Sequence, residues 1–414
     1  MVTCKTACAR IGCVFPDVKL ITYSAKQSIA AFAAIILISF SICGQSPRTS
    51  TDNTAERQLN LLVLGDSILW GQGLKEEHKA WYQVKNWMQK TSGRMVREKI
   101  EAHSGALVGS AGDSPWNTAT RVDGEVNRPA PTVNDQIDDA LKSYADPSQV
   151  DLVLVDGCIN DIDARRFLNA ANTPDGIRNL THEKCGSLVE AALGRITSSF
   201  PKAHVIVTGY FPVISDQTEN DLFMRVLAKR FYTPAAGAPK ISDKQLRARL
   251  IEISKEWYQA SNQSLTEAAR KVDGQLAAKG SRQRVLFAEI TFLPKHSFGT
   301  SESRLWGFDA SALRKLLVVL TFGKVTIRAN DERRSQRAAS CKEVFKRSSG
   351  ETDDQKRTRE GNLMLCRLAA VGHPNRKGAV MYAEAISKQL KLLVDEAGWF
   401  RDGRSVTTPG NPIH

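Results

Sequence analysis

Short runs of apolar residues recur along the chain and predict five buried strands. The first covers Leu59–Gly65 and ends in a turn, and similar runs lie at 96–102, 150–156, 204–209 and 284–291. Segments of helical length separate these runs. Because strands that alternate with helices build parallel sheets with right-handed crossovers, we predict an α/β three-layer sandwich with a central, mostly parallel five-stranded sheet.

Two of the intervening stretches show the 3.6-residue periodicity of helices. Leu188, Ala192 and Ile196 share one face of a helix that precedes the fourth strand. Beyond His373, a further set of apolar residues recurs at helical spacing: Val380, Ala383, Ile386, Leu390 and Leu393. This second set predicts a helix that closes the domain, with Pro374 at its first position.

Two longer segments exceed what a minimal sheet requires. Residues 241–280 predict a long polar helix or a helix pair. Residues 293–370 form a long connection with a charged stretch at 348–360, and such a segment serves as a lid, a binding loop or a disordered excursion. We therefore predict one domain at 58–400 that carries these two insertions, followed by a tail, 401–414.

An uncharged apolar run, Ser28–Cys43, lies near the N-terminus. At 16 residues it is short for a membrane span and long for the apolar region of a signal peptide. We predict that residues 1–57 form a leader and linker that export the protein, with the leader either cleaved or kept as a membrane anchor. A lipid on Cys43 is a further option, although Phe40–Ile42 lacks the small residue expected before a lipidated cysteine.

The overall composition is that of a folded, basic protein. Among 414 residues, 42% are hydrophobic and 24% are charged, which argues against extensive disorder. The formal net charge is +13, but Lys and Arg are scattered and form no Arg-rich arm or basic repeat. We therefore expect a basic soluble surface and no nucleic-acid partner, and the oligomeric state is left open.

Four cysteines lie outside the leader: Cys158, Cys185, Cys341 and Cys366. An even number of cysteines in an exported chain permits two disulfides, and four cysteines allow three pairings. The sequence has no Cys/His cluster with metal-ligand spacing, so we expect no zinc site.

The turn after the first predicted strand, Gly65–Gly73, carries a candidate nucleophile, Ser67. A residue just beyond a parallel strand lies at the carboxyl edge of the sheet, where ligands bind. The N-terminus of a following helix also favours negative charge there. By itself, Gly-Asp-Ser also fits an ordinary turn whose serine caps a helix.

Four segments of the chain resemble, in order, the conserved blocks of the SGNH/GDSL hydrolases. They are Gly65–Gly73, Ala102–Ala106, Asp156–Asp161 and Gly372–Ala383. Three of them follow predicted strands, as chemistry at one sheet edge requires. The resemblance covers about residues 59–398 and implies a flavodoxin-like sandwich that cleaves carboxylic esters without a metal or another cofactor.

The resemblance also implies a role for each of four residues. Ser67 would attack the acyl carbonyl, and His373 would take its proton and pass it to the leaving alcohol. The oxyanion would be held by the backbone N–H groups of Ser67 and Gly105 and by the side-chain amide of Asn160. Singly, Gly105 fits a turn glycine and Asn160 a helix cap or Asx turn. Together they favour a serine esterase that acts on a small-molecule, glycan or lipid ester.

The chain departs from the family at two positions. The family commonly has an aspartate three residues before the histidine, where this chain has Ala370. We therefore expect a backbone carbonyl, or a carboxylate from elsewhere, to orient His373. Cys158 stands where a glycine is often found, and it fits either a small packing residue or a disulfide with Cys185. The alternative to an esterase is a weak or inactive module that binds a polysaccharide or an acyl chain in the same cleft.

Two other histidines require comparison with His373. His296 follows the last predicted strand and is the rival base, although a loop histidine of this kind is more often solvated or in contact with substrate. His103 precedes Gly105 and is expected to face a helix. The loop at 296–308 and the segment 241–280 are expected to shape the acyl and alcohol pockets.

Overall fold

The computed structural model describes residues 58–109, 125, 131–237, 241–309, 311, 320, 327–396 and 398–400. The predicted leader with Cys43 and the tail after residue 400 lie outside the described residues. Among the residues that are described, no helix has the length and hydrophobicity needed to cross a membrane.

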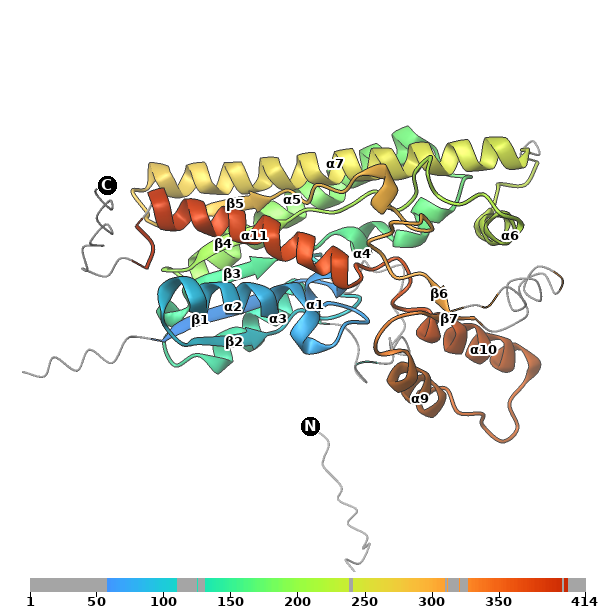
Figure 1. Cartoon of the computed structure of the whole chain (residues 1–414), viewed down its shortest axis with the longest axis horizontal. Coiled ribbons are helices and arrows are strands. Elements are labelled where there is room, and N and C mark those ends of the chain that lie inside the picture. Colours follow the sequence, from blue (N-terminus) through green and yellow to red (C-terminus); the bar gives the residue numbers. More distant parts are fainter. Residues whose placement is uncertain are drawn as a thin grey trace, which may run out of the picture. The chain divides into compact units, whose positions relative to one another are not determined.

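Five parallel strands form the central sheet in the order β2-β1-β3-β4-β5 (Figure 1). They are β1 (Leu59–Leu64), β2 (Val96–Ile100), β3 (Leu152–Val155), β4 (His204–Thr208) and β5 (Val285–Ala288). All five predicted strands and the predicted flavodoxin-like sandwich are confirmed. The strand order reverses between β1 and β3, which pair from Leu61–Leu152 to Leu64–Val155.

Helices cover both faces of this sheet, which explains why its strands are apolar almost throughout. On one face α2 (Ala80–Ser92) lies beside α11 (Arg376–Glu396), and Figure 1 shows both in front of the sheet. The other face carries α3 (Val133–Ser143), α5 (Pro174–Ser199) and α7 (Asp243–Ala278). The predicted helix with Leu188, Ala192 and Ile196 is α5.

Shorter elements connect the sandwich. The α-helices are α1 (Ser67–Trp70), α4 (Ile159–Ile162), α6 (Leu222–Phe231), α9 (Arg334–Val344) and α10 (Asp353–Arg367). The 3₁₀ turns are η1 (Glu76–His78), η3 (Pro147–Gln149), η4 (Ala164–Leu168) and η5 (Pro294–His296). A small antiparallel pair joins β6 (Phe308–Asp309) to β7 (Arg328–Ala329).

The segment 241–280 is one helix of 36 residues, α7, and not a helix pair. Its start is fixed by a capping box, in which Ser242 and Gln245 satisfy each other's backbone N–H groups. The helix is polar only on its outer side, because its inner side buries Trp257 and other apolar residues against the core. The prediction of a polar helix did not recognise that exposed and buried positions alternate along α7, so that one of its sides is apolar.

The described part of 293–370 contains helices and turns. A disulfide between Cys341 and Cys366 joins α9 to α10. A second disulfide joins Cys158 to Cys185 of α5, so Cys158 is a bonded cysteine and not a free packing residue.

The helix predicted from the periodic set is α11, but the expectation that Pro374 starts it was wrong. The helix begins at Arg376, so Pro374 precedes it, and the side chain of Asn375 accepts hydrogen bonds from the amides of Lys377 and Gly378. Pro374 is instead bridged to Leu305. Val380 is 40% exposed, whereas the other four apolar positions of the periodic set are buried.

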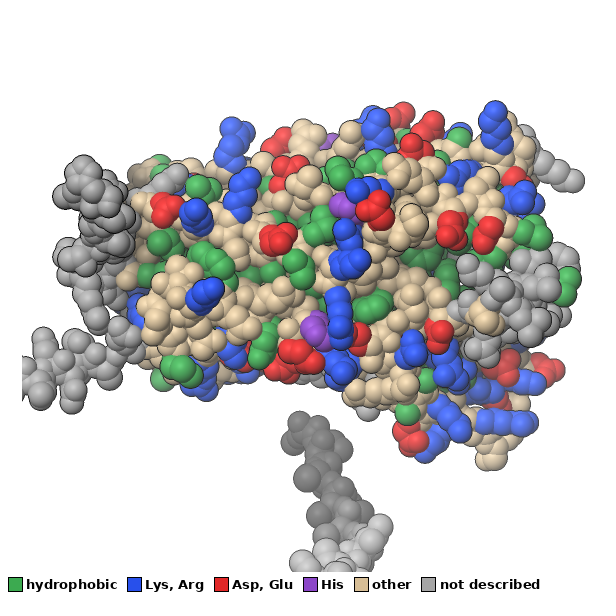
Figure 2. All heavy atoms as spheres, viewed as in Figure 1, with side chains coloured by type: hydrophobic (Ala, Val, Ile, Leu, Met, Phe, Trp, Pro, Cys, Tyr) green, Lys and Arg blue, Asp and Glu red, His purple; other side chains and the backbone are tan. Residues whose placement is uncertain are grey.

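The surface carries its charges in mixed order. Figure 2 shows Lys and Arg interspersed with Asp and Glu over the visible face. Several of these residues form ion pairs, such as Lys271 with Glu190 and Arg178 with Glu256. The basic residues, which are spread along the sequence, are therefore also spread over this face.

Candidate active site

The ends of β1 and β3 bring two candidate residues to the same edge of the sheet. Ser67 opens α1 directly after β1, and Asn160 lies in α4 after β3. This is the place where the strand order reverses, and it is where open α/β sheets bind ligands.

Ser67 and His373 are in direct contact. The Nε2 atom of His373 lies 2.8 Å from the Oγ atom of Ser67, although 306 residues separate them in sequence. Backbone hydrogen bonds hold the histidine loop in place: the His373 amide donates to the Ala370 carbonyl, and the Trp306 amide donates to the His373 carbonyl. At this distance an imidazole nitrogen can accept the proton of the serine hydroxyl.

Gly105 and Asn160 follow β2 and β3, the two strands that flank β1. The side-chain amide of Asn160 donates to the carbonyl of Ala106 at 2.9 Å, which leaves its second hydrogen for another acceptor. Gly105 has φ +82°, a conformation that favours glycine. Within the described residues, the backbone N–H groups of Ser67 and Gly105 have no acceptor.

A pair of buried carboxyl groups supports the turn that carries Ser67. The Asp66 amide donates to Oδ1 of Asp156 at 2.6 Å, and the Leu69 amide donates to Oδ2 of the same carboxyl at 2.9 Å. The Asp66 side chain caps α1 by accepting from the Ile68 amide. Gly65 permits this approach, because a Cβ there would lie 1.8 Å from Oδ1 of Asp156.

Burial raises the pKa of both carboxyl groups. The pKa of Asp66 rises to about 6, mainly because the group is removed from water, and hydrogen bonds from Ile68 and Tyr210 oppose the rise. Burial, together with the nearby charge of Asp66, raises the pKa of Asp156 well above its usual value. The pair therefore holds a proton at pH values where an exposed aspartate is ionised.

Sequence reasoning missed the function of three supporting residues. Asp156 was noted only as part of a motif, and Tyr210 and Gln136 were not singled out. The Tyr210 hydroxyl donates to Asp66 at 2.9 Å, and Gln136 exchanges two hydrogen bonds with the backbone of Gly65. For Tyr210 a signal existed, because it follows β4 at the carboxyl edge of the sheet.

The segment that carries Asn160 is held by a second set of contacts. The Asp161 carboxylate accepts from the amides of Val108 and Gly109, which ties α4 to the loop after Gly105. Burial raises the pKa of Asp161 as well. Cys158 has φ +102°, which explains why glycine is common there, and its disulfide to α5 holds this unusual backbone.

His296 and His103 are not the partners of Ser67. His296 is buried, contrary to the expectation of a solvated residue, and its Nδ1 accepts from the Leu293 amide at 3.2 Å. Burial also lowers the pKa of His296. The Nδ1 atom of His103 lies 2.9 Å from the Ser104 carbonyl.

The position of the missing aspartate, Ala370, is fully buried. A Cβ on Gly73 would lie 2.8 Å from Cβ of Ala370 and 2.9 Å from Cβ of Asp331, so these side chains converge on the end of the nucleophile turn. Asp331 is bound to the buried Arg337, which also pairs with Glu125. The group that orients the other ring nitrogen of His373 stays a prediction.

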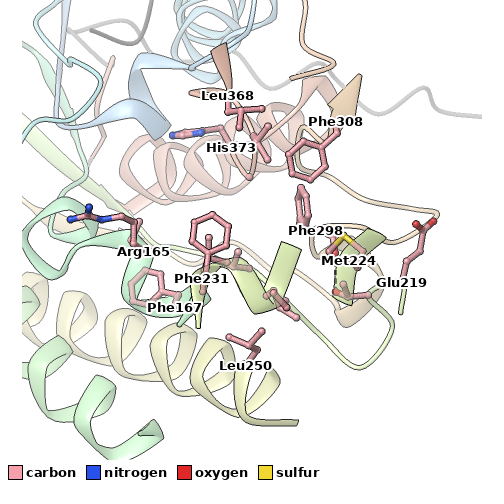
Figure 3. A pocket seen from close by; sticks show the side chains of 18 of the residues that line it. Arg165, Phe167, Glu219, Met224, Phe231, Leu250, Phe298, Phe308, Leu368 and His373 are labelled. Carbon is pink, nitrogen blue, oxygen red and sulfur yellow. Dashed lines mark hydrogen bonds between the residues drawn. The ribbon is translucent and has the colours of Figure 1, made fainter. Parts of the chain in front are cut away.

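A cavity of about 350 Å³ opens beside Ser67 and His373. Of the 30 residues that line it, 18 are apolar. Figure 3 shows His373 at one edge and Leu250 of α7 at the opposite edge, with Phe231 and Phe298 between them. The site thus combines a hydrogen-bonded serine and histidine with an apolar space. Within the described residues, no cluster of His, Cys, Asp and Glu has the composition to hold a metal ion.

Comparison with known proteins gives matches only among solved structures; no family model and no curated protein matches the chain. One match is the extracellular lipase of Streptomyces rimosus, with 15% identity, a TM-score of 0.36, and coverage of 64% of this chain and 100% of the lipase. Phospholipase A1 of Streptomyces albidoflavus has 11% identity, a TM-score of 0.35, and coverage of 63% and 98%. The esterase EstA of a Pseudoalteromonas species has 11% identity, a TM-score of 0.32, and coverage of 81% and 98%.

These structural neighbours are a lipase, a phospholipase and an esterase. At these identities and TM-scores the likeness carries no argument about chemistry, which rests on the residues of the site.

Proposed function

We propose that this protein is a serine hydrolase that cleaves carboxylic esters through an acyl-enzyme. The observation that carries the proposal is the 2.8 Å contact between Ser67 Oγ and His373 Nε2 at the strand edge. A histidine that accepts the proton of a serine hydroxyl makes the serine oxygen a strong nucleophile.

In the first half of the reaction, Ser67 Oγ forms a bond to the acyl carbon and its proton passes to His373 Nε2. The bond between the acyl carbon and the alkoxy oxygen then breaks, and His373 returns the proton to the departing alcohol. In the second half, His373 takes a proton from water while the water oxygen attacks the acyl carbon. The carboxylic acid leaves, and Ser67 recovers its proton.

Each tetrahedral intermediate carries a negative oxygen that needs donors. The proposal assigns this task to the amides of Ser67 and Gly105 and to the Asn160 side chain. It is supported by the absence of competing acceptors for both amides within the described residues, and by the second hydrogen of the Asn160 amide. One donor of this kind is typically worth about 3 kcal/mol of transition-state stabilisation.

We further propose that the protein acts outside the cytoplasm. Two disulfides join residues of the domain, and structural disulfides persist mainly in oxidising compartments. A fusion of residues 1–60 to a reporter that is active only after export should give signal. A stably expressed but silent fusion would contradict this part of the proposal.

A covalent probe tests the hydrolase directly. A fluorophosphonate should label the wild-type protein at Ser67, and Ser67→Ala should abolish both the labelling and the hydrolysis of p-nitrophenyl acetate. Circular dichroism of the variant checks that it is folded. A wild-type protein that neither reacts with the probe nor cleaves the ester would favour a binding module, and equal activity of the two proteins would remove Ser67 from the reaction.

A further inference from the structure

The cavity beside Ser67 extends away from the sheet into the two insertions. Ser67 and Asn160 line its end at the strand edge. Leu246 and Leu250 of α7 line it as well, and Figure 3 places Leu250 across the space from His373. A group bonded to the acyl carbon at Ser67 would therefore point into a space whose walls are built by the two insertions together with η4 and α6.

The walls are apolar and come from separate elements. Phe231 belongs to α6, Phe298 follows η5, and Phe308 begins β6. Leu368 and Leu365 extend the wall at the end of α10, where Leu365 is 42% exposed and brings the cavity to the surface. A volume of about 350 Å³ falls within the range of sites that bind small organic molecules.

Four of the six charged residues of this lining have partners in the structure, and one of the four, Arg165, pairs with Asp163. Lys229 pairs with Asp243 at 2.7 Å, and both lie on the lining. Arg247 donates to the carbonyls of Asp216 and Thr218. Because these four groups already have partners and most of the lining is apolar, the cavity favours an apolar ligand.

We propose that this cavity binds the acyl chain of the substrate, and that the enzyme prefers fatty acyl esters of about eight carbons or more over acetyl esters. The inference rests on the proposed hydrolase, since the chain is attached to the carbon that Ser67 attacks. A methylene group needs roughly the ~30 Å³ that a water molecule occupies in the liquid, so the cavity has room for a chain of this length. The aliphatic residues Leu246, Leu250 and Ala228 suit an unbranched chain.

A series of p-nitrophenyl esters from two to twelve carbons, kept below their aggregation limits, tests the preference. Burial of each added methylene should raise kcat/KM by up to about fourfold until the chain fills the cavity. Ala228→Phe places a ring in the cavity and should lower the ratio of decanoyl to acetyl kcat/KM at least tenfold. The matched control, Ala248→Phe, adds the same ring to an exposed position of α7 outside the lining and should leave both rates unchanged.

A binding measurement separates this inference from the proposed hydrolase. Calorimetry with decanoate should show one site in the wild-type protein and weakened binding in Ala228→Phe, whether or not esters are cleaved. If Ala228→Phe does not fold, Leu246→Trp repeats the test. Hydrolysis that favours acetyl over decanoyl esters, or decanoate binding that neither variant weakens, would overturn the acyl-chain site. If decanoate binds but the protein neither hydrolyses esters nor reacts with the fluorophosphonate, the proposed hydrolase function is wrong and the proposed acyl-chain site still stands.

Discussion

The proposed nucleophile and the proposed base lie in two regions that are held in place by different interactions. The nucleophile turn, Gly65–Gly73, sits on the central sheet and is fixed by buried polar side chains: Asp66, Asp156, Tyr210 and Gln136. The base segment, 293–375, is fixed by backbone hydrogen bonds around Trp306 and His373 and by the disulfide Cys341–Cys366.

The different interactions that hold the two regions fit what each region does in the proposed reaction. The nucleophile turn must keep one oxygen at a fixed place, and buried hydrogen bonds to the backbone do this with little freedom. The base segment must also provide a wall for the cavity, and a charged, disulfide-linked insertion can change its lining without disturbing the sheet. In the proposed reaction, the first region positions the attacking oxygen, whereas the second supplies His373 and part of the cavity wall.

The largest expected effect comes from removing the base. His373→Ala should lower kcat/KM for p-nitrophenyl acetate by about 10⁴-fold or more, because Ser67 would lose its proton acceptor. His296→Asn is the control, since the amide oxygen can still accept from the Leu293 amide and this residue does not contact Ser67. Steady-state kinetics of both variants check the assignment, and a loss of similar size in His296→Asn would contradict it.

The next largest effect is expected at Asn160, the proposed side-chain donor to the oxyanion. Asn160→Ala should lower kcat by about 10²–10³-fold and change KM less, because the amide acts mainly on charge that develops in the transition state. Asn160→Asp keeps the size of the side chain but removes both donor hydrogens, so it should show a comparable loss. An unchanged kcat in either variant would remove Asn160 from the site.

The disulfide Cys341–Cys366 allows the base segment to be weakened by itself, and Cys158–Cys185, which lies in neither region, serves as the matched control. They span similar sequence separations, 27 residues for Cys158–Cys185 and 25 for Cys341–Cys366, so removing either should lower the free energy of unfolding by about 3 kcal/mol. The double alanine variant at Cys341 and Cys366 should lower the decanoyl to acetyl ratio of kcat/KM, because α10 lines the cavity. Denaturant titration and ester kinetics measure the two effects. A ratio that falls only in the variant at Cys158 and Cys185 would show that the base segment does not set the acyl selectivity.

The smallest expected effect is a change in the pH dependence of stability, caused by the buried pair Asp66 and Asp156 below Ser67. Because the pKa of Asp66 is raised to about 6, the folded state binds more protons than the unfolded state between about pH 4 and 6. This contribution stabilises the protein at low pH and is lost as the pH rises through about 6. Asp156→Asn removes one of the two raised carboxyl groups and should make this loss of stability smaller.

The measurement is the difference between the wild-type protein and Asp156→Asn, from denaturant titrations between pH 4 and 7. A difference is needed because burial lowers the pKa of His204 to about 4, which acts on stability in the opposite direction over the same range. Identical pH profiles for the two proteins would show that the Asp66–Asp156 pair does not hold the extra proton.

The sequence by itself determined the sheet, because strands buried on both faces leave continuous apolar runs such as Leu59–Leu64. It also placed Ser67 and Asn160 at strand ends, since the carboxyl edge of a parallel sheet follows from the order of strands and helices. The pairing of Ser67 with His373 was expected from a family resemblance, and the tertiary structure brings the two side chains into contact.

Only the tertiary structure decided what surrounds these residues. The contacts from Tyr210 and Gln136 to the nucleophile turn span 144 and 71 residues, and local patterns do not encode such distant partners. The same holds for the choice among three cysteine pairings and for the burial of His296, because both depend on how the insertion folds back on the sheet. The cavity exists for this reason as well: its walls come from residues as far apart as Phe167 and Leu368, which only chain folding makes neighbours.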